Sequence, residues 1–211
     1  NEEGIGDFMT LTVEGGAVGG VPAGGIRFGS AYNADALLDQ GYQFDFYDGG
    51  GLDLCYLGLA ECDGHGNINV SRFGPRIAGC GGFINITQNT HKVFFCGTFT
   101  ARGLKVKVED GKVVIAQEGK QKKFLKDVEQ ITFNGDIALQ NKQEVMYITE
   151  RCVFQLKEDG MHLTEIAPGI DLQTQILDMM DFEPIVDRDA NGEIKLMDAK
   201  LFAEGLMGLK E

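Results

Sequence analysis

A single carboxylate placed directly before a dense run of glycines is the feature of this sequence best suited to chemistry. In "LTVEGGAVGGVPAGG", residues 11–25, Glu14 ends an apolar stretch and Gly15 follows it. Glycine-rich backbone can approach a ligand closely because no side chain stands in the way. If residues 8–14 form a strand, Glu14 lies at a strand end, where open α/β sheets bind ligands. A lone glutamate after a strand is more often a solvated surface residue, and both interpretations stay open at this point.

The spacing of the glycines does not favour a nucleotide phosphate loop. The segment lacks the G-x-x-x-x-G-K-[ST] spacing, and it lacks a dinucleotide fingerprint with an acidic residue about 20 positions further on. Pro22 within it cannot donate a backbone N–H to a phosphate. A tight connection that packs a helix against a strand remains the alternative to a ligand-binding role.

Cysteine and histidine offer a second set of reactive side chains, but their spacing does not indicate a metal site. No second close pair accompanies Cys62 and His65 to complete a four-ligand zinc pattern. The five cysteines are an odd number without framework spacing, so we expect reduced thiols in a cytoplasmic compartment. Cys55 and Cys96 lie in apolar stretches and are expected to be buried as small hydrophobic residues. The cysteine and histidine side chains that could contribute to such a metal site are Cys62, His65, Cys80, His91 and Cys96.

Composition excludes several classes of partner. The 211 residues carry a formal net charge of −13, which argues against nonspecific binding to nucleic acid or to an anionic membrane. No apolar run approaches the roughly 18 residues of a transmembrane helix. The start, "NEEGIGDFM", has no signal-peptide pattern and no initiator Met, so we expect a processed or expressed piece of a longer chain.

Short apolar stretches between glycine clusters predict the elements that position Glu14. Strands are expected within 8–14, 52–61, 68–70 and 91–99, and helices within 33–40 and 81–89. This alternation favours a mostly parallel open sheet with flanking helices and with its ligand edge in the glycine-rich connections.

From about residue 104 the pattern changes to alternating apolar and polar residues. Asp110-Gly111 and Asp159-Gly160 each predict a β-hairpin, and 133–150 adds strand-like material. Residues 169–182 and 198–209 are amphipathic and read as helices. The sequence therefore predicts a single α/β domain over 1–211, extended by antiparallel hairpins in its second half.

Three segments resemble the C-terminal half of the family I coenzyme A transferases, of the acetate/propionate and 3-oxoacid type. They are "TLTVEGGAVGGVPAGG", "FDFYDGGGLDLCYLGLAECDGHGNINVSRFG" and "GCGGFINI", in that order and at compatible spacing. The similarity runs over most of the chain and is densest from residue 10 to 100.

The resemblance implies roles for particular residues. Glu14 corresponds to the catalytic glutamate, and Gly79, Gly81 and Gly82 correspond to the family's G-x-G-G loop, with Cys80 at the variable position. Asn67, in the "GN-N" turn, is a weaker candidate for contact with coenzyme A or the acyl group, and a turn-forming role is its alternative. The family's first half is missing, so we expect an N-terminal half as partner, on the same or a separate chain, in a homo- or hetero-oligomer.

The implied activity is transfer of coenzyme A from an acyl-CoA to a short-chain carboxylate such as acetate, propionate or acetoacetate. It runs by a ping-pong mechanism through an acyl-glutamyl anhydride and a glutamyl-CoA thioester. Coenzyme A is then a substrate, and no tightly bound cofactor is expected. The alternatives are a non-catalytic acyl-thioester or sugar-phosphate binding domain, and a thioesterase that uses the same glutamate.

Overall fold

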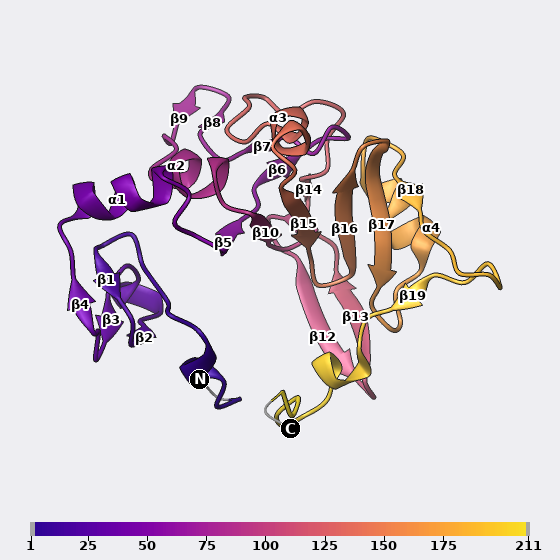
Figure 1. The fold of residues 1–211 in the computed structure, drawn as a ribbon. Coiled ribbons are helices and arrows are strands. Elements are labelled where there is room, and N and C mark those ends of the chain that lie inside the picture. The colour runs from indigo at the N-terminus through magenta and orange to yellow at the C-terminus, as the bar shows by residue number, and fades with distance from the viewer. Residues whose placement is uncertain (1–2, 210–211) are drawn as a thin grey trace.

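The largest element of the protein is a seven-stranded mixed sheet (Figure 1). The computed structural model describes residues 3–209. Strands follow the order β18-β17-β16-β15-β10-β5, and β19 pairs with β17 beside this path. Their bounds are β5 Leu54–Gly58, β10 Lys92–Cys96, β15 Glu144–Ile148, β16 Cys152–Lys157, β17 Gly160–Ile166, β18 Ile185–Val186 and β19 Lys195–Leu196.

Parallel pairing dominates this sheet, as the sequence predicts. β5, β10 and β15 run parallel, β15, β16 and β17 are joined as antiparallel neighbours, and β18 and β19 run parallel to β17. The expected α/β class, a parallel sheet extended by hairpins, is confirmed. The third parallel strand, β15, follows residue 104, so parallel and hairpin regions alternate along the chain.

The core lies on the face of the parallel strands that is covered by α2 (Phe83–Gln88) and α3 (Gly135–Gln140). Successive strand side chains point to opposite faces, so one alternate set faces these helices. The ring of Phe95 stacks on Phe83 of α2 with centroids 5.6 Å apart. The strand side chains on this face are fully buried: Val93, Phe95, Val145 and Tyr147.

Each α-helix that begins after a polar residue is capped by that side chain. Asp39 accepts the Gly41 N–H at 3.0 Å before α1 (Gln40–Asp48), and Asp171 precedes α4 (Leu172–Gln175) in the same way. The helix predicted over 33–40 is therefore wrong, because the capping residue is Asp39. The 3-10 turns are η1 Gly6–Phe8, η2 Gly25–Arg27, η3 Leu177–Met179 and η4 Ala199–Phe202, so the C-terminal stretches are less helical than predicted.

Small antiparallel pairs make up much of the remaining chain. Within the described residues, the segment 8–14 starts in η1 and ends in a turn at Glu14, and it joins a ladder only through the Thr12–Val18 bridge, so the predicted strand is not formed. The pairs are β1 Ala17–Val18 with β4 Ala36–Leu37, β2 Val21–Pro22 with β3 Ala31–Tyr32, β6 Glu61–Cys62 with β7 Ile68–Asn69, β8 Arg72–Phe73 with β9 Arg76–Ile77, β11 Thr100–Ala101 with β14 Gln121–Lys122, and β12 Lys105–Glu109 with β13 Lys112–Gln117.

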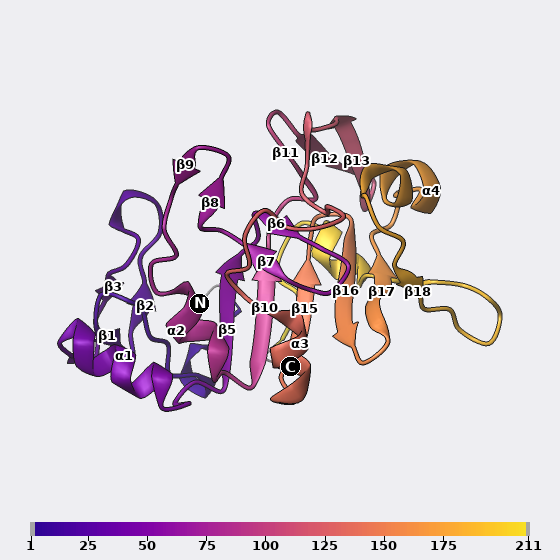
Figure 2. The same cartoon turned by 90° about the horizontal axis from the view of Figure 1, so that it is seen from above.

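Both predicted hairpins are present. Asp110 and Gly111 have φ values of 51° and 71°, the left-handed pair that a tight turn between β12 and β13 requires. Gly160 opens β17 after the turn from β16. Figure 2 shows β1 to β4 and α1 beyond β5 at one side of the sheet, and the β12–β13 hairpin standing away from it.

A fully buried arginine connects three segments in the second half of the chain. Arg151, 0% exposed, donates to Glu150 at 2.7 Å and to Glu118 at 2.9 Å, and it also donates to the Gln175 carbonyl. Its guanidinium lies 4.8 Å from the centre of the Phe99 ring. Burial opposes ionisation of Glu118, but hydrogen bonds from Arg151, Thr100 and a backbone N–H outweigh it and hold the pKa of Glu118 below its ordinary value.

Replacing this arginine should destabilise the protein strongly. Arg151→Ala leaves Glu118 and Glu150 without their partner, at an expected cost of about 3–5 kcal/mol in the free energy of unfolding. The matched control is Arg72→Ala, because Arg72 makes an exposed pair with Glu129 at 3.6 Å, a class of interaction with a contribution of about 0–1 kcal/mol. Urea unfolding measures both.

The same network predicts a pH dependence. Because the pKa of folded Glu118 is lowered, its stabilisation is complete above the ordinary glutamate pKa and is lost as pH falls through the lowered value. The difference in stability between the parent protein and Arg151→Ala should therefore shrink in acid. A difference independent of pH would contradict this assignment.

Candidate active site

Glu14 lies in a tight turn whose shape depends on glycine. The Gly16 N–H donates to the Val13 carbonyl at 3.0 Å, and the Val13 N–H donates to the Ala17 carbonyl at 3.1 Å. Gly16 has a φ of 103°, and a side chain there would overlap the Leu38 carbonyl. The glycine that follows Glu14 by two positions is thus required by the turn itself.

Two side chains of α1 hold the residues just before Glu14. Gln43 donates its amide N–H to the Val13 carbonyl at 2.6 Å, and the Tyr47 hydroxyl donates to Thr12 Oγ1 at 2.8 Å. Gln43 also donates to the Tyr47 hydroxyl at 2.5 Å, as spacing of four residues on one helix face allows. Gln43 and Tyr47 are 1% and 2% exposed. The backbone leading to Glu14 is therefore fixed by a buried hydrogen-bond network.

The last residue of α1 fastens this helix to α2. Both carboxylate oxygens of Asp48 accept from Asn85, at 3.0 and 3.1 Å, and one also accepts from Gln88 at 3.2 Å. Asn89 donates to the Asp48 backbone carbonyl at 2.6 Å. Because α1 holds the Glu14 turn and also holds α2, it sets the position of one relative to the other.

The Glu14 turn and the 79–82 loop meet at Gly82, directly before α2. A side chain at Gly82 would overlap Glu14 Oε1 and the Phe44 ring of α1, so these groups touch the bare α-carbon. The structure thus brings together Glu14 and the loop that the sequence assigned to the same site. Glu14 itself is half-buried.

The backbone N–H groups of the 79–82 loop differ in whether they already donate a hydrogen bond within the protein. The Gly79 N–H donates to the Ser71 carbonyl at 3.0 Å and is already used. Within residues 3–209, the Gly81 and Gly82 N–H groups make no hydrogen bond. Gly81 has a φ of 54° with open space beside its α-carbon. Of the predicted glycines, Gly81 and Gly82 are therefore the ones with donors free for a ligand.

Asn67 lies in a turn rather than beside Glu14. Its side-chain oxygen accepts the Gly135 N–H at 3.0 Å and its amide donates to Asp63 at 3.1 Å. It is 8% exposed. These contacts tie the 63–67 turn to the start of α3, which is the turn-forming role weighed against ligand binding.

Phe44 and Gln43 contact the Glu14 turn or Gly82, but neither is among the site residues expected from the sequence. Both belong to α1, which lies seven residues later than the helix predicted there. The cap at Asp39 and the Gln43–Tyr47 spacing are the signals that would have found them.

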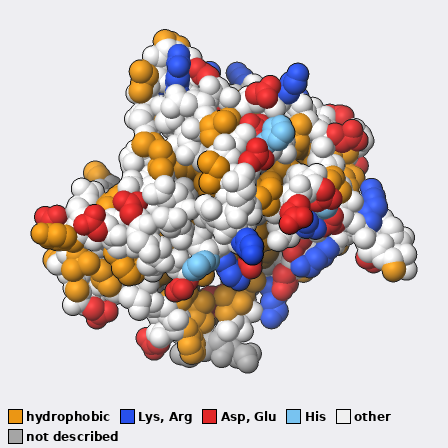
Figure 3. Space-filling model, turned by 45° about the horizontal axis from the view of Figure 1, so that its top comes forward, with side chains coloured by type: hydrophobic (Ala, Val, Ile, Leu, Met, Phe, Trp, Pro, Cys, Tyr) orange, Lys and Arg blue, Asp and Glu red, His pale blue; other side chains and the backbone are white. Residues whose placement is uncertain are grey.

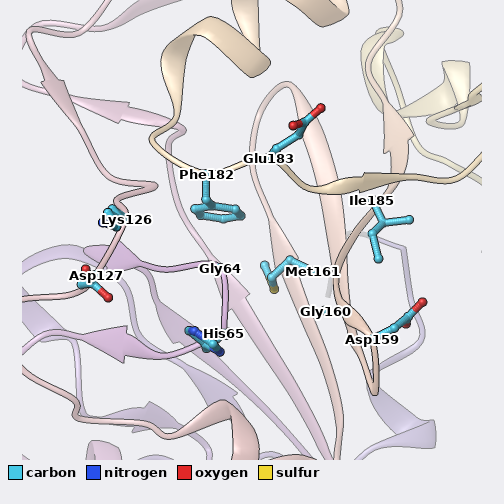
Figure 4. Close-up of a pocket in the computed structure, with 10 residues that line it drawn as sticks. All are labelled: Gly64, His65, Lys126, Asp127, Asp159, Gly160, Met161, Phe182, Glu183 and Ile185. Carbon is cyan, nitrogen blue, oxygen red and sulfur yellow. The ribbon is translucent and has the colours of Figure 1, made fainter.

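A pocket of about 340 Å³ lies elsewhere, between the 64–65 turn, the 159–161 turn and 182–185 (Figure 4). Its charged lining includes Asp127, Asp159 and Glu183 but only Lys126 among lysines and arginines. Such a lining repels phosphates, so the pocket is a poor site for a coenzyme. Neither Glu14 nor Gly82 lines it.

The described part of the chain has neither a cluster of metal-ligating side chains nor a membrane-spanning helix. Within residues 3–209, no three His, Cys, Asp or Glu side chains are arranged to hold a metal ion. Over the same range, no helix has the length and apolar character that crossing a membrane requires.

Cys55 is buried as predicted, but Cys96 is exposed, because it points to the face of the sheet opposite α2 and α3.

Known proteins similar to this chain are coenzyme A transferases. Acetate CoA-transferase YdiF of Escherichia coli K12 is 54% identical over 98% of this chain, and caffeate CoA-transferase of Acetobacterium woodii is 52% identical over 99%. The chain spans 38% and 40% of their respective lengths. The solved structure of YdiF from E. coli O157:H7 as a thioester complex with CoA matches with a TM-score of 0.90 and 53% identity, covering 98% of this chain and 38% of that one. No protein-family model matches the chain.

Removing the Gln43 amide should loosen the turn that carries Glu14. Gln43→Leu removes one hydrogen bond from the Val13 carbonyl, which keeps the Gly16 N–H, and one from the Tyr47 hydroxyl, at an expected cost of about 0.5–1.5 kcal/mol for each. Hydrogen exchange followed by mass spectrometry should show faster exchange in the 12–16 peptide. Gln88→Leu is the matched control, because Gln88 is exposed and its loss should change stability by less than about 0.5 kcal/mol. Equal exchange in the two variants would contradict the network.

Proposed function

The chain belongs to the coenzyme A transferases, and on this premise we propose that the complete protein transfers coenzyme A from an acyl-CoA to a short-chain carboxylate, with Glu14 as nucleophile. The observation that carries the proposal is the contact of the Glu14 carboxylate with Gly82, beside two unused backbone donors. The thioester complex of the similar YdiF structure supports a covalent intermediate.

The reaction itself favours a carboxylate as nucleophile. Reactants and products each contain one thioester and one carboxylate, so the exchange is close to thermoneutral. A serine would form an ester that is too stable to return its acyl group to a thiol. A carboxylate forms an anhydride and then a thioester, both of high energy, so every step stays reversible. A carboxylate also needs no general base, since it is ionised at neutral pH.

Four bond exchanges complete the cycle. A Glu14 oxygen attacks the acyl-CoA carbonyl, the C–S bond breaks, and the thiolate leaves an acyl-glutamyl anhydride. The thiolate then attacks the Glu14 carbonyl, releases the first carboxylate and forms the glutamyl-CoA thioester. The acceptor carboxylate attacks this thioester and regenerates an anhydride and a thiolate. Attack of the thiolate on the new acyl carbonyl gives the product acyl-CoA and free Glu14.

The 79–82 loop supplies the electrostatic part of the mechanism. Each addition places negative charge on a carbonyl oxygen, and fixed N–H donors stabilise that charge by roughly 3–4 kcal/mol each. We assign this task to the Gly81 and Gly82 N–H groups. Gly82 must lack a side chain because Glu14 and Phe44 occupy its α-carbon surface. The Phe44 ring limits the access of water, which would hydrolyse either intermediate.

The substrates and the assembly of the complete protein are proposed from its relatives. Acetate and caffeate, named in the two similar enzymes, are both carboxylates, so the acceptor class is proposed and the individual acid is not. An N-terminal half, on the same or a separate chain, completes the active enzyme and binds part of coenzyme A. The free cysteines, three of them buried, support a cytoplasmic location.

Trapping the intermediate tests the nucleophile. When the complete enzyme is incubated with acyl-CoA and borohydride, the glutamyl thioester should be reduced to an alcohol at position 14, as peptide mass spectrometry would show. Glu14→Gln should lose both the trapped product and transfer, by several orders of magnitude, while retaining its fold. Glu14→Asp moves the carboxylate by about 1.5 Å, and misplacement near 1 Å costs about a hundredfold in rate. Transfer by Glu14→Gln at the parental rate would sink the mechanism unless the amide had reverted to Glu.

A side chain at Gly82 should impair catalysis more than stability. Gly82→Val in the complete enzyme would press on Glu14 and the Phe44 ring and should lower kcat by about a hundredfold, with a smaller effect on thermal unfolding. Gly24→Val is the matched control, because open space surrounds Gly24 and its φ of −98° suits any residue. Equal kinetics for the two variants would remove Gly82 from the site.

A further inference from the structure

The face of the sheet opposite α2 and α3 exposes apolar side chains on β5 and a cysteine on β10, whereas its residues Met146 and Ile148 on β15 are partly buried. Tyr56 is 66% exposed and Leu54 40% exposed. The strand register aligns Phe94 with Tyr56 on one side and with Met146 on the other. The next row along aligns Cys96 with Gly58 and Ile148. We call this surface the Tyr56 face; it consists of Leu54, Tyr56, Phe94, Cys96, Met146 and Ile148.

Parallel strands do not normally leave one face to water. Parallel sheets are found with both faces covered, because their strands are apolar on both sides. The helices that contact the parallel strands, α2 and α3, pack on the buried side. Tyr56 and Phe94 instead stack on each other with ring centroids 5.0 Å apart and 18° between their planes. These rings form a ready-made apolar surface.

The edge of the Tyr56 face is charged. At the amino ends of the strands, Lys92 of β10 pairs with Glu144 of β15 at 3.1 Å, and both side chains are at least half exposed. Apolar residues in the middle with ionic residues at the rim are the arrangement of a protein interface. A lipid surface is disfavoured by the net charge of −13.

The size of the face distinguishes between two protein occupants. Three strands of five residues span roughly 15 Å by 17 Å, or about 250 Å². A stable dimer between separate copies needs about 800 Å² on each partner. The face is too small to hold a second copy by itself, but it suits a segment already held in place by the rest of one protein.

We propose that the Tyr56 face packs against the part of the complete transferase that lies outside this chain. Relatives more than 50% identical to the chain are about two and a half times its length, so such a segment is available. The inference rests on the proposed function only in taking the complete protein to have its relatives' length. Its test does not use activity.

Photo-cross-linking in the complete protein tests the inference. When the photoreactive residue p-benzoylphenylalanine replaces Tyr56, irradiation should join position 56 to a peptide from outside residues 1–211, as mass spectrometry would identify. The matched control places the same residue at Ile137, which is 54% exposed on α3, on the opposite side of the sheet. That position should give no such product.

Cysteine alkylation gives a second measurement that needs no substitution. Cys96 is exposed on the Tyr56 face in this structure. In the native complete protein its alkylation by iodoacetamide should be lost, and it should return on unfolding. A cross-link from position 56 to another copy of this chain, or no cross-link together with rapid native alkylation of Cys96, would overturn the proposal. Loss of transferase activity with the cross-link intact would instead count against the proposed function alone.

Discussion

The placement of Glu14 depends on one buried hydrogen-bond network, made by Gln43 and Tyr47 of α1. Their contacts to the Val13 carbonyl and to Thr12 fix the chain on the amino side of Glu14. The side-chain oxygen of Gln43 is buried and has no hydrogen-bond partner within residues 3–209. An unpaired buried acceptor costs about 1–3 kcal/mol, and such groups persist where other contacts fix the geometry. Here the geometry so fixed is that of the proposed nucleophile.

Short-range packing converts this placement into a chemical site. α1 is tied to α2 through Asp48, and α2 begins directly after Gly82. The three parts therefore behave as one unit in which Glu14 Oε1, the Phe44 ring and the Gly82 α-carbon are in contact. Catalysis through an anhydride needs a carboxylate that is close to fixed donors and shielded from water. In the proposed mechanism the Gly81 and Gly82 N–H groups are the donors, and the Phe44 ring limits the access of water.

The two sides of the central sheet have different surroundings. One side is buried under α2 and α3 and carries aromatic contacts such as Phe95 with Phe83. The other exposes Tyr56, whose ring stacks on the partly buried ring of Phe94. Exposed apolar side chains also gather over the N-terminal elements, at the left of Figure 3. Among residues 3–48, the large hydrophobic side chains with the largest exposed fractions are Ile26, Phe28, Leu37 and Phe8. These surfaces fit a segment that folds within a larger protein, and its relatives are indeed much longer.

Local signals in the sequence determined a large part of this structure. Asp110-Gly111 has the left-handed backbone of a tight turn, Asp159-Gly160 lies where β16 turns into β17, and apolar runs marked β5 and β10. The family resemblance of the glutamate and glycine motifs led to the expectation that Glu14 and the 79–82 loop share a site, and the structure places Glu14 against Gly82. Tertiary structure alone decided which residues meet. The Ser71 carbonyl accepts the Gly79 N–H, and the side-chain oxygen of Asn67 accepts the Gly135 N–H. Both contacts join segments that are separated along the chain, which periodicity along the chain does not encode.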